Sequence, residues 1–418
     1  MRLKTSEVKY ESMLVLMFFL AWGFLFLDRQ ALSMLMPLMI EDIAMTNTQI
    51  GQVNMWQTIG FAVSAPVFAI LSDRLGHKKQ IIFWATMVTS VLALITMFAG
   101  SYGYLLIVRT LLGASEGVIL PIAISMLAAV SRPKKLGRNM GLIYAGSAVI
   151  GVAIGPVVVT QLGELFNWRW SFLFVSFPSF VTALLMLKYI KPDVPSTENQ
   201  PSGRESVSFQ QIFSVLKNRN ILICVLLSIC CMGAMWTFNS FIPLYLTQVS
   251  LLSVTKMGLV MGLFGLLTIF WQVFIPFSSD KVGRKPAMIG YAFLAVGTPM
   301  MLFLYPESWM SLAVYVMIGG VILALNTIYQ SIIPVESVPG SVMATANSLI
   351  MGTGELIGAL SIGLSGVLAD AYGLTAVMVV IAVCFLTASI VSFTLRETLK
   401  GKEKPVKHVP MPEAAGSE

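Results

Sequence analysis

Twelve long apolar segments divide the sequence, and each is long enough to cross a bilayer, which takes about 20 apolar residues in a helix. The segments are residues 13–39, 49–72, 80–100, 103–130, 139–163, 169–190, 220–248, 254–279, 286–305, 309–333, 341–367 and 373–395. Backbone N–H and C=O groups cannot stay unpaired in lipid, so only helices or closed barrels span membranes, and these segments are too long and uniformly apolar for barrel strands. The sequence predicts an all-α membrane protein with twelve transmembrane helices.

Composition supports a lipid environment and excludes several classes of function. Of the 418 residues, 56% are hydrophobic and 11% are charged, whereas soluble domains carry about 25% charged residues. No basic stripe with interleaved aromatic residues is present, so nucleic acid is not expected as a partner. The four cysteines all lie in apolar segments, and the two histidines, His77 and His408, lie in polar ones. No metal site, cofactor or disulfide is therefore predicted.

The distribution of basic residues predicts the orientation in the membrane. Of the 27 lysines and arginines, 23 fall in one set of connecting segments. The opposite loops contain Arg169 and Lys256 together with five acidic residues, which are Glu41, Asp42, Glu164, Glu307 and Asp370. Because basic loops stay in the cytoplasm, we expect a multi-pass protein of the cell membrane with both termini cytoplasmic.

An internal repeat divides the chain near its midpoint. The sequence Asp73-Arg74-Leu75-Gly76-His77-Lys78-Lys79 follows the second segment, and Asp280-Lys281-Val282-Gly283-Arg284-Lys285 follows the eighth, 207 residues later. We therefore expect two six-helix bundles related by pseudo-two-fold symmetry, residues 1–190 and 220–397, joined by a cytoplasmic linker at 191–219 and followed by a disordered cytoplasmic tail at 398–418. A parallel repeat of this kind is typical of transporters whose binding site lies between the halves.

Four ionisable residues interrupt the apolar segments of the first half: Asp28, Arg29, Arg109 and Glu116. A charge in hydrocarbon costs several kcal/mol unless it is paired or faces a polar cavity, so these residues indicate a functional site. Asp28 and Arg29 point about 100° apart on a helix, while Arg109 and Glu116 share one face about 10 Å apart. The simplest arrangement is cross-pairing between spans one and four. Protonation of both acids would free two positive charges to hold an anion. Alternatively, the charges only hold the helices together.

Further polar residues lie in the apolar segments of the second half. Glu355 could carry a second proton, select against some substrates, or cap a local helix break beside Gly352 and Gly354. Five other positions could contact substrate hydroxyls or bond a neighbouring helix: Asn239, Gln272, Asn326, Tyr329 and Gln330.

The repeated loop is interpreted as a conformational latch. An aspartate at a helix end can pair with a basic residue or a helix N-terminus of a neighbour and hold one conformation closed. Glycine permits the tight turn. The predicted latch residues are Asp73, Arg74, Gly76, Lys78, Asp280, Gly283 and Arg284.

The twelve spans, the central linker and the duplicated Asp-x-x-Gly-x-Lys loop resemble the major facilitator superfamily over Met13 to about Glu397. The family usually has a glycine four positions before the loop aspartate, where this chain has Ala69 and Pro276, and the second copy reads Gly283-Arg284-Lys285.

A narrower resemblance comes from the buried charges. Leu27-Asp28-Arg29, and the run from Arg109 to Glu116 followed by Pro121, resemble the organic-anion transporters of this superfamily, the anion:cation symporter group. That resemblance implies that Asp28 and Glu116 carry protons, that Arg29 contacts a substrate carboxylate, and that Arg109 partners Glu116. The run from Gly151 to Pro156 partly resembles a motif of proton-coupled drug exporters, but Val159-Thr160 replaces its trailing glycines.

Together these features predict a secondary active transporter rather than an enzyme, because no nucleophile–base set, phosphate loop or metal cluster appears in the sequence. The expected partners are a small organic anion (a carboxylate or sugar acid), protons and the lipid bilayer, and we expect a functional monomer working by alternating access. One alternative is a proton-driven exporter of drugs or amphiphiles, and another is a transporter-like ligand sensor. The substrate, the direction of transport and the choice between symport and antiport stay open.

Overall fold

The first half of the chain forms a bundle of helices in a computed structural model that describes residues 5–191 and 215–399. Most of the predicted linker and nearly all of the predicted tail lie outside the described residues. The elements of the first half are α1 (Thr5–Asp42), α2 (Asn47–Leu75), α3 (Lys78–Ile95), η1 (Thr96–Phe98), α4 (Tyr102–Glu116), α5 (Ile119–Val130), α6 (Pro133–Gly146), η2 (Ser147–Ile154), α7 (Gly155–Phe166) and α8 (Trp168–Tyr189).

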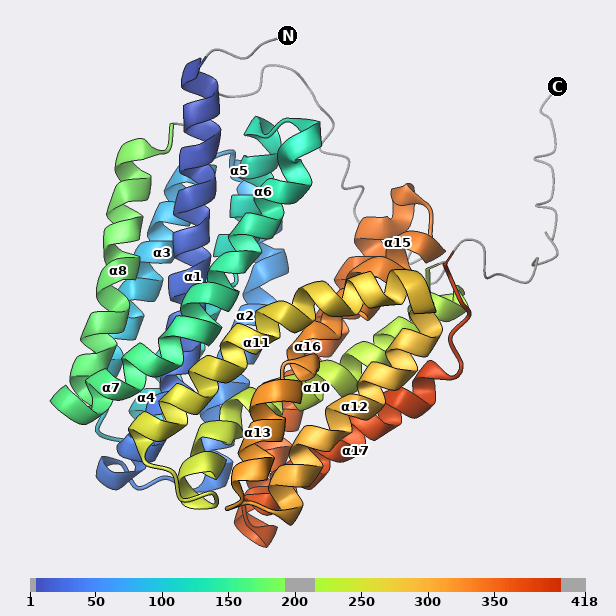
Figure 1. Ribbon diagram of the computed structural model, residues 1–418. Helices are drawn as coiled ribbons and strands as arrows, with labels where there is room; N and C mark the ends of the chain where they lie inside the picture. The colour runs from blue at the N-terminus through green and yellow to red at the C-terminus, as the bar shows by residue number, and fades with distance from the viewer. Residues whose placement is uncertain (1–4, 192–214, 400–418) are drawn as a thin grey trace.

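The second half repeats this arrangement in a second bundle (Figure 1). Its elements are α10 (Arg219–Gln248), α11 (Val254–Val282), α12 (Arg284–Leu304), α13 (Trp309–Ile318), α14 (Val321–Ala324), η3 (Thr327–Ile332), α15 (Ile333–Ser337), α16 (Gly340–Tyr372) and α17 (Thr375–Ser392). Within the described ranges, 11 continuous or slightly broken helices are long and apolar enough to cross a membrane. Helix α2, with 29 residues, is about 44 Å long and supplies the twelfth. The predicted all-α membrane architecture is confirmed.

Helix breaks occur at places that the apolar pattern does not reveal. The predicted fourth span breaks between α4 and α5 at Gly117 and Val118, because Pro121 has no N–H for the Gly117 carbonyl and its ring crowds that carbonyl. The predicted tenth span breaks at Gly319 and Gly320. By contrast, α16 runs unbroken through Gly352 and Gly354. The suggestion that Glu355 caps a local break is therefore wrong.

The helix ends define two faces of the molecule. The distal face is formed by the connections at residues 43–46, 99–101, 167, 249–253, 305–308 and 373–374, which include most of the acidic loops. The basic face is the opposite end and carries the connections at residues 76–77, 131–132, 283 and 338–339.

Close packing joins the two halves on the distal side of the membrane. Helix α2 packs along α16, and α7 with η2 packs along α11, as Figure 1 shows for α7 and α11. Glycines permit this approach: a Cβ at Gly51 would lie 2.8 Å from the Ile362 carbonyl oxygen, and one at Gly258 would lie 2.7 Å from that of Pro156. At the basic face, described contacts such as Lys78–Ser125 and Glu11–Asn139 stay within one half.

Candidate functional site

The four buried charges of the first half form two ion pairs between α1 and α4. Asp28 Oδ2 lies 3.0 Å from Arg109 Nη1, and Arg29 Nε lies 3.7 Å from Glu116 Oε2. All four residues are buried, and Arg109 and Glu116 are completely so. The predicted cross-pairing between spans one and four is confirmed. The pairing of Arg109 with Glu116 that the resemblance implied is wrong, because two helical turns separate these side chains and Asp28 is the nearer acid.

Gly113 and Gly117, near the end of α4, let α4 pack closely against α2. A Cβ at Gly113 would lie 2.0 Å from the Gln57 carbonyl oxygen, and one at Gly117 would lie 2.4 Å from that of Phe61. Small residues at such crossings let backbones approach within a membrane. The two helices therefore pack nearly backbone to backbone, and Glu116, the last residue of α4, is held beside Arg29.

The two arginines of the cluster have different surroundings. Arg109 is enclosed within the first half, with its guanidinium 4.9 Å from the centre of the Phe172 ring. Arg29 lies at the boundary between the halves: its guanidinium is 4.7 Å from the Phe61 ring on α2 and 4.6 Å from the Trp236 ring on α10. Its Nη2 also donates to Thr58 Oγ1 over 3.3 Å. Arg29 is thus the arginine of the cluster that lies at the contact between the halves.

A small polar cavity adjoins Arg29 and has a water-accessible volume of about 20 Å³, room for roughly one water. Most of the lining residues have polar side chains, and they come from both halves: Phe26, Arg29, Gln30, Ser33, Asn54, Gln57, Thr58, Trp236, Asn239 and Ser240. Gln57 Nε2 and Trp236 Nε1 are buried and make no hydrogen bond of ordinary geometry to a described residue, although Gln57 lies close to the Glu116 carboxylate and Trp236 close to that of Glu355. A ligand entering this region would meet these two donors beside a cation. The cavity would have to widen to admit one.

The remaining predicted substrate contacts divide into three groups. Asn239 lines the polar cavity beside Arg29, and its contact with a substrate stays a prediction. Asn326 and Gln330 instead donate to the sulfur atoms of Met235 and Met232 on α10, and Tyr329 donates to Asn326. Gln272 is exposed on α11 and does not line this cavity. For Asn326 and Gln330 the structure shows the alternative of a bond to a neighbouring helix, whereas Tyr329 bonds within its own segment. The structure does not bring Gln272 together with Arg29.

Glu355 approaches the cluster from the second half. A Cβ at Gly354 would lie 2.2 Å from Ser228 Oγ, and one at Gly358 would lie 3.2 Å from the Trp236 ring, so α16 packs tightly against α10. Glu355 therefore lies within electrostatic range of Arg29. Its Oε2 is buried and accepts no hydrogen bond from the part of the chain that the structure describes.

The first copy of the predicted latch is described only in part. The side chains of Asp73 and Arg74 lie outside the described residues. Gly76 has a φ of 67° and ends α2 with its N–H bonded to the Ser72 carbonyl, so the tight turn expected of this glycine is present. Lys78 donates from Nζ to Ser125 Oγ over 2.6 Å.

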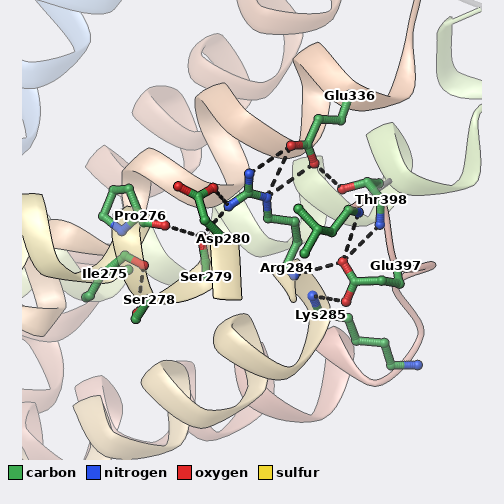
Figure 2. A network of polar contacts seen from close by, with 11 residues as sticks. Ile275, Pro276, Ser278, Ser279, Asp280, Arg284, Lys285, Glu336, Glu397 and Thr398 are labelled. Carbon is green, nitrogen blue, oxygen red and sulfur yellow. Dashed lines mark hydrogen bonds and ion pairs between the residues drawn. The ribbon is translucent and has the colours of Figure 1, made fainter. Parts of the chain in front are cut away.

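The second copy is a network inside the second half, which Figure 2 shows. Arg284 pairs with Asp280 at 2.6 Å and with Glu336 at 2.9 Å, while Gly283 adopts a φ of 112°. Glu397 accepts from the backbone N–H groups of Arg284 and Lys285 at the start of α12. These contacts fasten the loop to α15 and to the segment after α17. A latch between the halves stays a prediction for these residues.

Three residues around Arg29 were missed by sequence reasoning: Thr58, Phe61 and Trp236. Phe61 and Trp236 look like ordinary apolar positions in a membrane helix, and only docking of helices brings them to the guanidinium. Trp236 nevertheless follows Arg29 by 207 residues, the offset of the repeated loop. Aligning the two halves would therefore have identified it.

Comparison with known proteins identifies the family. The family model described as Major Facilitator Superfamily matches residues 18–362 and 253–415, which together span nearly the whole chain. The structure is similar to the crystal structure of a bacterial homologue of the human lysosomal transporter Spinster in an inward-facing, unoccupied conformation. The TM-score is 0.81 at 18% sequence identity, covering 95% of this chain and 99% of that one.

Two characterised classes of transporter occur among the relatives. The multidrug resistance protein MdtG of Proteus mirabilis is 25% identical over 394 residues, which cover 90% of this chain and 93% of the relative. The hexuronate transporter of Bacillus subtilis is 26% identical over 286 residues, 67% of each chain. One relative is named for an organic anion, and the other for drug resistance.

Proposed function

The chain belongs to the Major Facilitator Superfamily, and we propose that it is a secondary active transporter of a small organic anion, coupled to protons and working by alternating access. The substrate class is a carboxylate or sugar acid. The observation that carries the proposal is Arg29, a buried guanidinium at the boundary between the halves whose ion-pair partner is 3.7 Å away.

Arg29 supports recognition of an anion because its present partner is replaceable. At 3.7 Å the contact with Glu116 is longer than a hydrogen bond, and both Glu116 oxygens lack a donor among the described residues. A carboxylate substrate can offer the guanidinium two parallel hydrogen bonds, which is a stronger arrangement. The Gln57 and Trp236 nitrogens nearby make no hydrogen bond of ordinary geometry and could turn from the Glu116 and Glu355 carboxylates to hydroxyl or carboxyl oxygens of such a ligand.

Coupling to protons follows from the loss of the ion-pair partner of Glu116 when a substrate binds. When a substrate carboxylate binds the Arg29 guanidinium in place of Glu116, an ionised Glu116 becomes an unpaired charge in a completely buried position, which is costly. Binding a proton removes that charge. Substrate and proton are therefore bound together, which is the requirement for symport. Asp28 keeps the shorter pair with Arg109 and is the second candidate carrier.

The relatives support this class and one alternative. The Bacillus subtilis relative is named for hexuronate, a sugar carboxylate of the kind that Arg29 would bind. The relative named for multidrug resistance matches 90% of this chain, and the aromatic rings of Phe61 and Trp236 could hold apolar compounds. The second candidate is therefore a proton-driven exporter of drugs or amphiphiles.

A matched pair of compounds separates the two functions. Purified protein in proteoliposomes, under an imposed pH gradient, is tested with radiolabelled D-glucuronate, its neutral amide glucuronamide, and the lipophilic cation tetraphenylphosphonium. We expect accumulation of a carboxylate and not of its amide, and a panel of other carboxylates extends the test if glucuronate is not accepted. Gradient-driven movement of the cation, with no carboxylate transported, would favour the exporter.

We further propose that the protein lies in the cell membrane with the basic face and both termini in the cytoplasm. The support is that 23 of the 27 basic residues lie in one set of connecting segments. Reporter fusions at Asn199 and Gly401 should report cytoplasm, and a fusion at Glu307, on the distal face, should report the outside. An external signal from either of the first two fusions would contradict this orientation.

A further inference from the structure

A carboxylate of the second half caps a helix of the first half at the distal face. Asp370, three residues before the end cap Gly373 of α16, accepts hydrogen bonds from the backbone N–H groups of Asn47 and Thr48, each at 2.8 Å. These residues are the first two of α2. We call this contact the α16–α2 clasp.

A carboxylate of the first half does the same to the second. Glu164, three residues before the end cap Asn167 of α7, accepts a 2.9 Å hydrogen bond from the backbone N–H of Thr255. It also accepts from the Thr255 hydroxyl. Thr255 is the second residue of α11. We call this contact the α7–α11 clasp.

The two clasps are equivalent under the internal repeat. Thr48 and Thr255 are separated by 207 residues, the offset of the repeated loop, and Glu164 and Asp370 are separated by 206. Each half thus contributes one carboxylate and one helix N-terminus. The first N–H groups of a helix have no partner within it and carry the positive end of its dipole, so an anion there is favoured.

Close packing beneath each clasp makes it sensitive to separation of the halves. A Cβ at Gly366 would lie 2.5 Å from the Asn47 carbonyl oxygen, and one at Gly258 would lie 1.9 Å from Thr160 Oγ1. The clasp hydrogen bonds of 2.8–2.9 Å cross this contact, so the carboxylates reach the helix ends only while the halves touch. Glu164 and Asp370 are exposed, so water can replace the lost hydrogen bonds when the halves part.

We propose that Glu164 and Asp370 form a paired clasp that holds the distal side of the transporter closed in this conformation and releases when the binding site opens to that side. Asp73 and Asp280 were expected to form a latch at the basic face. The paired clasp uses one interaction expected there, a carboxylate at a helix N-terminus, but at the distal face and between the two halves. The proposal rests on alternating access, which is part of the proposed function, but not on the identity of the substrate or on proton coupling.

The test measures the separation of the halves without any substrate. Nitroxide labels are attached at Gly100→Cys and Glu307→Cys, one on each half at the distal face, after the four native cysteines are replaced by alanine. Pulsed electron paramagnetic resonance in lipid nanodiscs then gives the distance distribution. In the otherwise unchanged protein we expect one dominant short distance.

Alanine at either clasp residue should increase the ratio of long-distance to short-distance populations roughly two- to fivefold, and both together by the product. The amide variants sharpen the test. Both oxygens of Asp370 accept from backbone N–H groups. In Asp370→Asn, the amide NH2 group must therefore face one of these N–H donors, and that hydrogen bond is lost. Glu164→Gln can still accept from the Thr255 N–H and donate to its hydroxyl, so it should change the ratio less than Asp370→Asn.

Asp42→Asn is the matched control, because Asp42 lies on the same face but bonds Arg169 and Trp168 of its own half. It should leave the distribution unchanged. If both alanine variants keep the original distribution, or if Asp42→Asn shifts it equally, the clasp is refuted. Gel filtration and thermal unfolding confirm that each variant is folded. Absence of anion transport would refute the substrate assignment and leave this result standing.

Discussion

The two halves share a scaffold but differ in the chemistry at equivalent positions. Arg29 on α1 corresponds by the 207-residue offset to Trp236 on α10, and Arg109 and Glu116 on α4 correspond to Val316 and Leu323. The first half thus carries a four-charge cluster where the second half carries apolar side chains. The helix arrangement and the clasps at the distal face are retained in both.

Under the proposed function, the repeat preserves the scaffold for alternating access, and the residues proposed to recognise the anion are concentrated in the first half. The two equivalent residues Arg29 and Trp236 contact each other, with the guanidinium 4.6 Å from the indole ring. An aromatic face attracts a cation without neutralising it or offering a competing carboxylate. The second half can therefore close against Arg29 and still leave its positive charge for an anion.

Removing the charge of Arg29 should reduce anion affinity more than any other change, because Arg29 is the proposed anion site and the second half has the uncharged Trp236 at the equivalent position. Loss of one member of a desolvated charge pair costs about 2–5 kcal/mol, which weakens anion binding roughly 30- to several-thousand-fold. Arg29→Ala should nearly abolish binding. Arg29→Lys should weaken it substantially, because an ammonium cannot match a carboxylate with two parallel hydrogen bonds. Equilibrium binding of the carboxylate selected by the substrate screen measures both effects.

The control is Arg169→Lys, the same chemical change at an arginine on the distal face that pairs with Asp42. It should bind the anion normally. Unchanged affinity in Arg29→Ala, with the protein folded and inserted, would contradict the anion assignment and favour the exporter.

The second prediction separates transport from coupling within the first half. Glu116→Gln removes an ionisable group from a completely buried position while keeping its shape. We expect the variant to lose uphill accumulation driven by a pH gradient and to keep substrate exchange, since the amide mimics the protonated acid. Counterflow and gradient-driven uptake in proteoliposomes measure the two activities separately.

Glu11→Gln is the matched control, since Glu11 is also buried in the first half but accepts a hydrogen bond from Asn139 near the basic face. It should accumulate substrate normally. Normal accumulation by Glu116→Gln would exclude Glu116 as the coupled site.

The sequence is sufficient to predict the fold and the paired charges because both depend on large energetic terms. Apolar segments of membrane length must be helices, and Asp28 or Glu116 cannot stay unpaired in lipid without a large cost. The contacts that need docking of the halves are not predictable in this way. Trp236 beside Arg29 and Asp370 at the start of α2 depend on how two rigid bundles meet. The break after Glu116 follows from Pro121 and was missed because the apolar pattern continues through it.

The third prediction tests the contact between the equivalent residues. A cation–π interaction is worth about 0.5–2 kcal/mol, so its loss in Trp236→Leu should change anion affinity roughly two- to 30-fold. Trp236→Phe keeps a ring and should change it less. Trp271→Leu is the control, because its indole bonds the Met317 carbonyl within the second half. Isothermal titration gives the affinities. Equal affinities for Trp236→Leu and Trp236→Phe would show that the ring has no role.

The smallest predicted effect concerns Glu355, an acid from the second half that lies within electrostatic range of Arg29. An ionised Glu355 repels an anion bound at that arginine, so Glu355→Gln should tighten anion binding by roughly two- to 17-fold, the range for charges about 10 Å apart at effective dielectric constants from about 80 down to about 20. Gradient-driven accumulation should persist, because we propose Glu116 as the carrier of the coupled proton. Titration and uptake on the same preparation measure both quantities. If Glu355→Gln instead abolishes accumulation, residues of both halves take part in proton coupling. The assignment of the ionic chemistry to the first half alone would then be wrong.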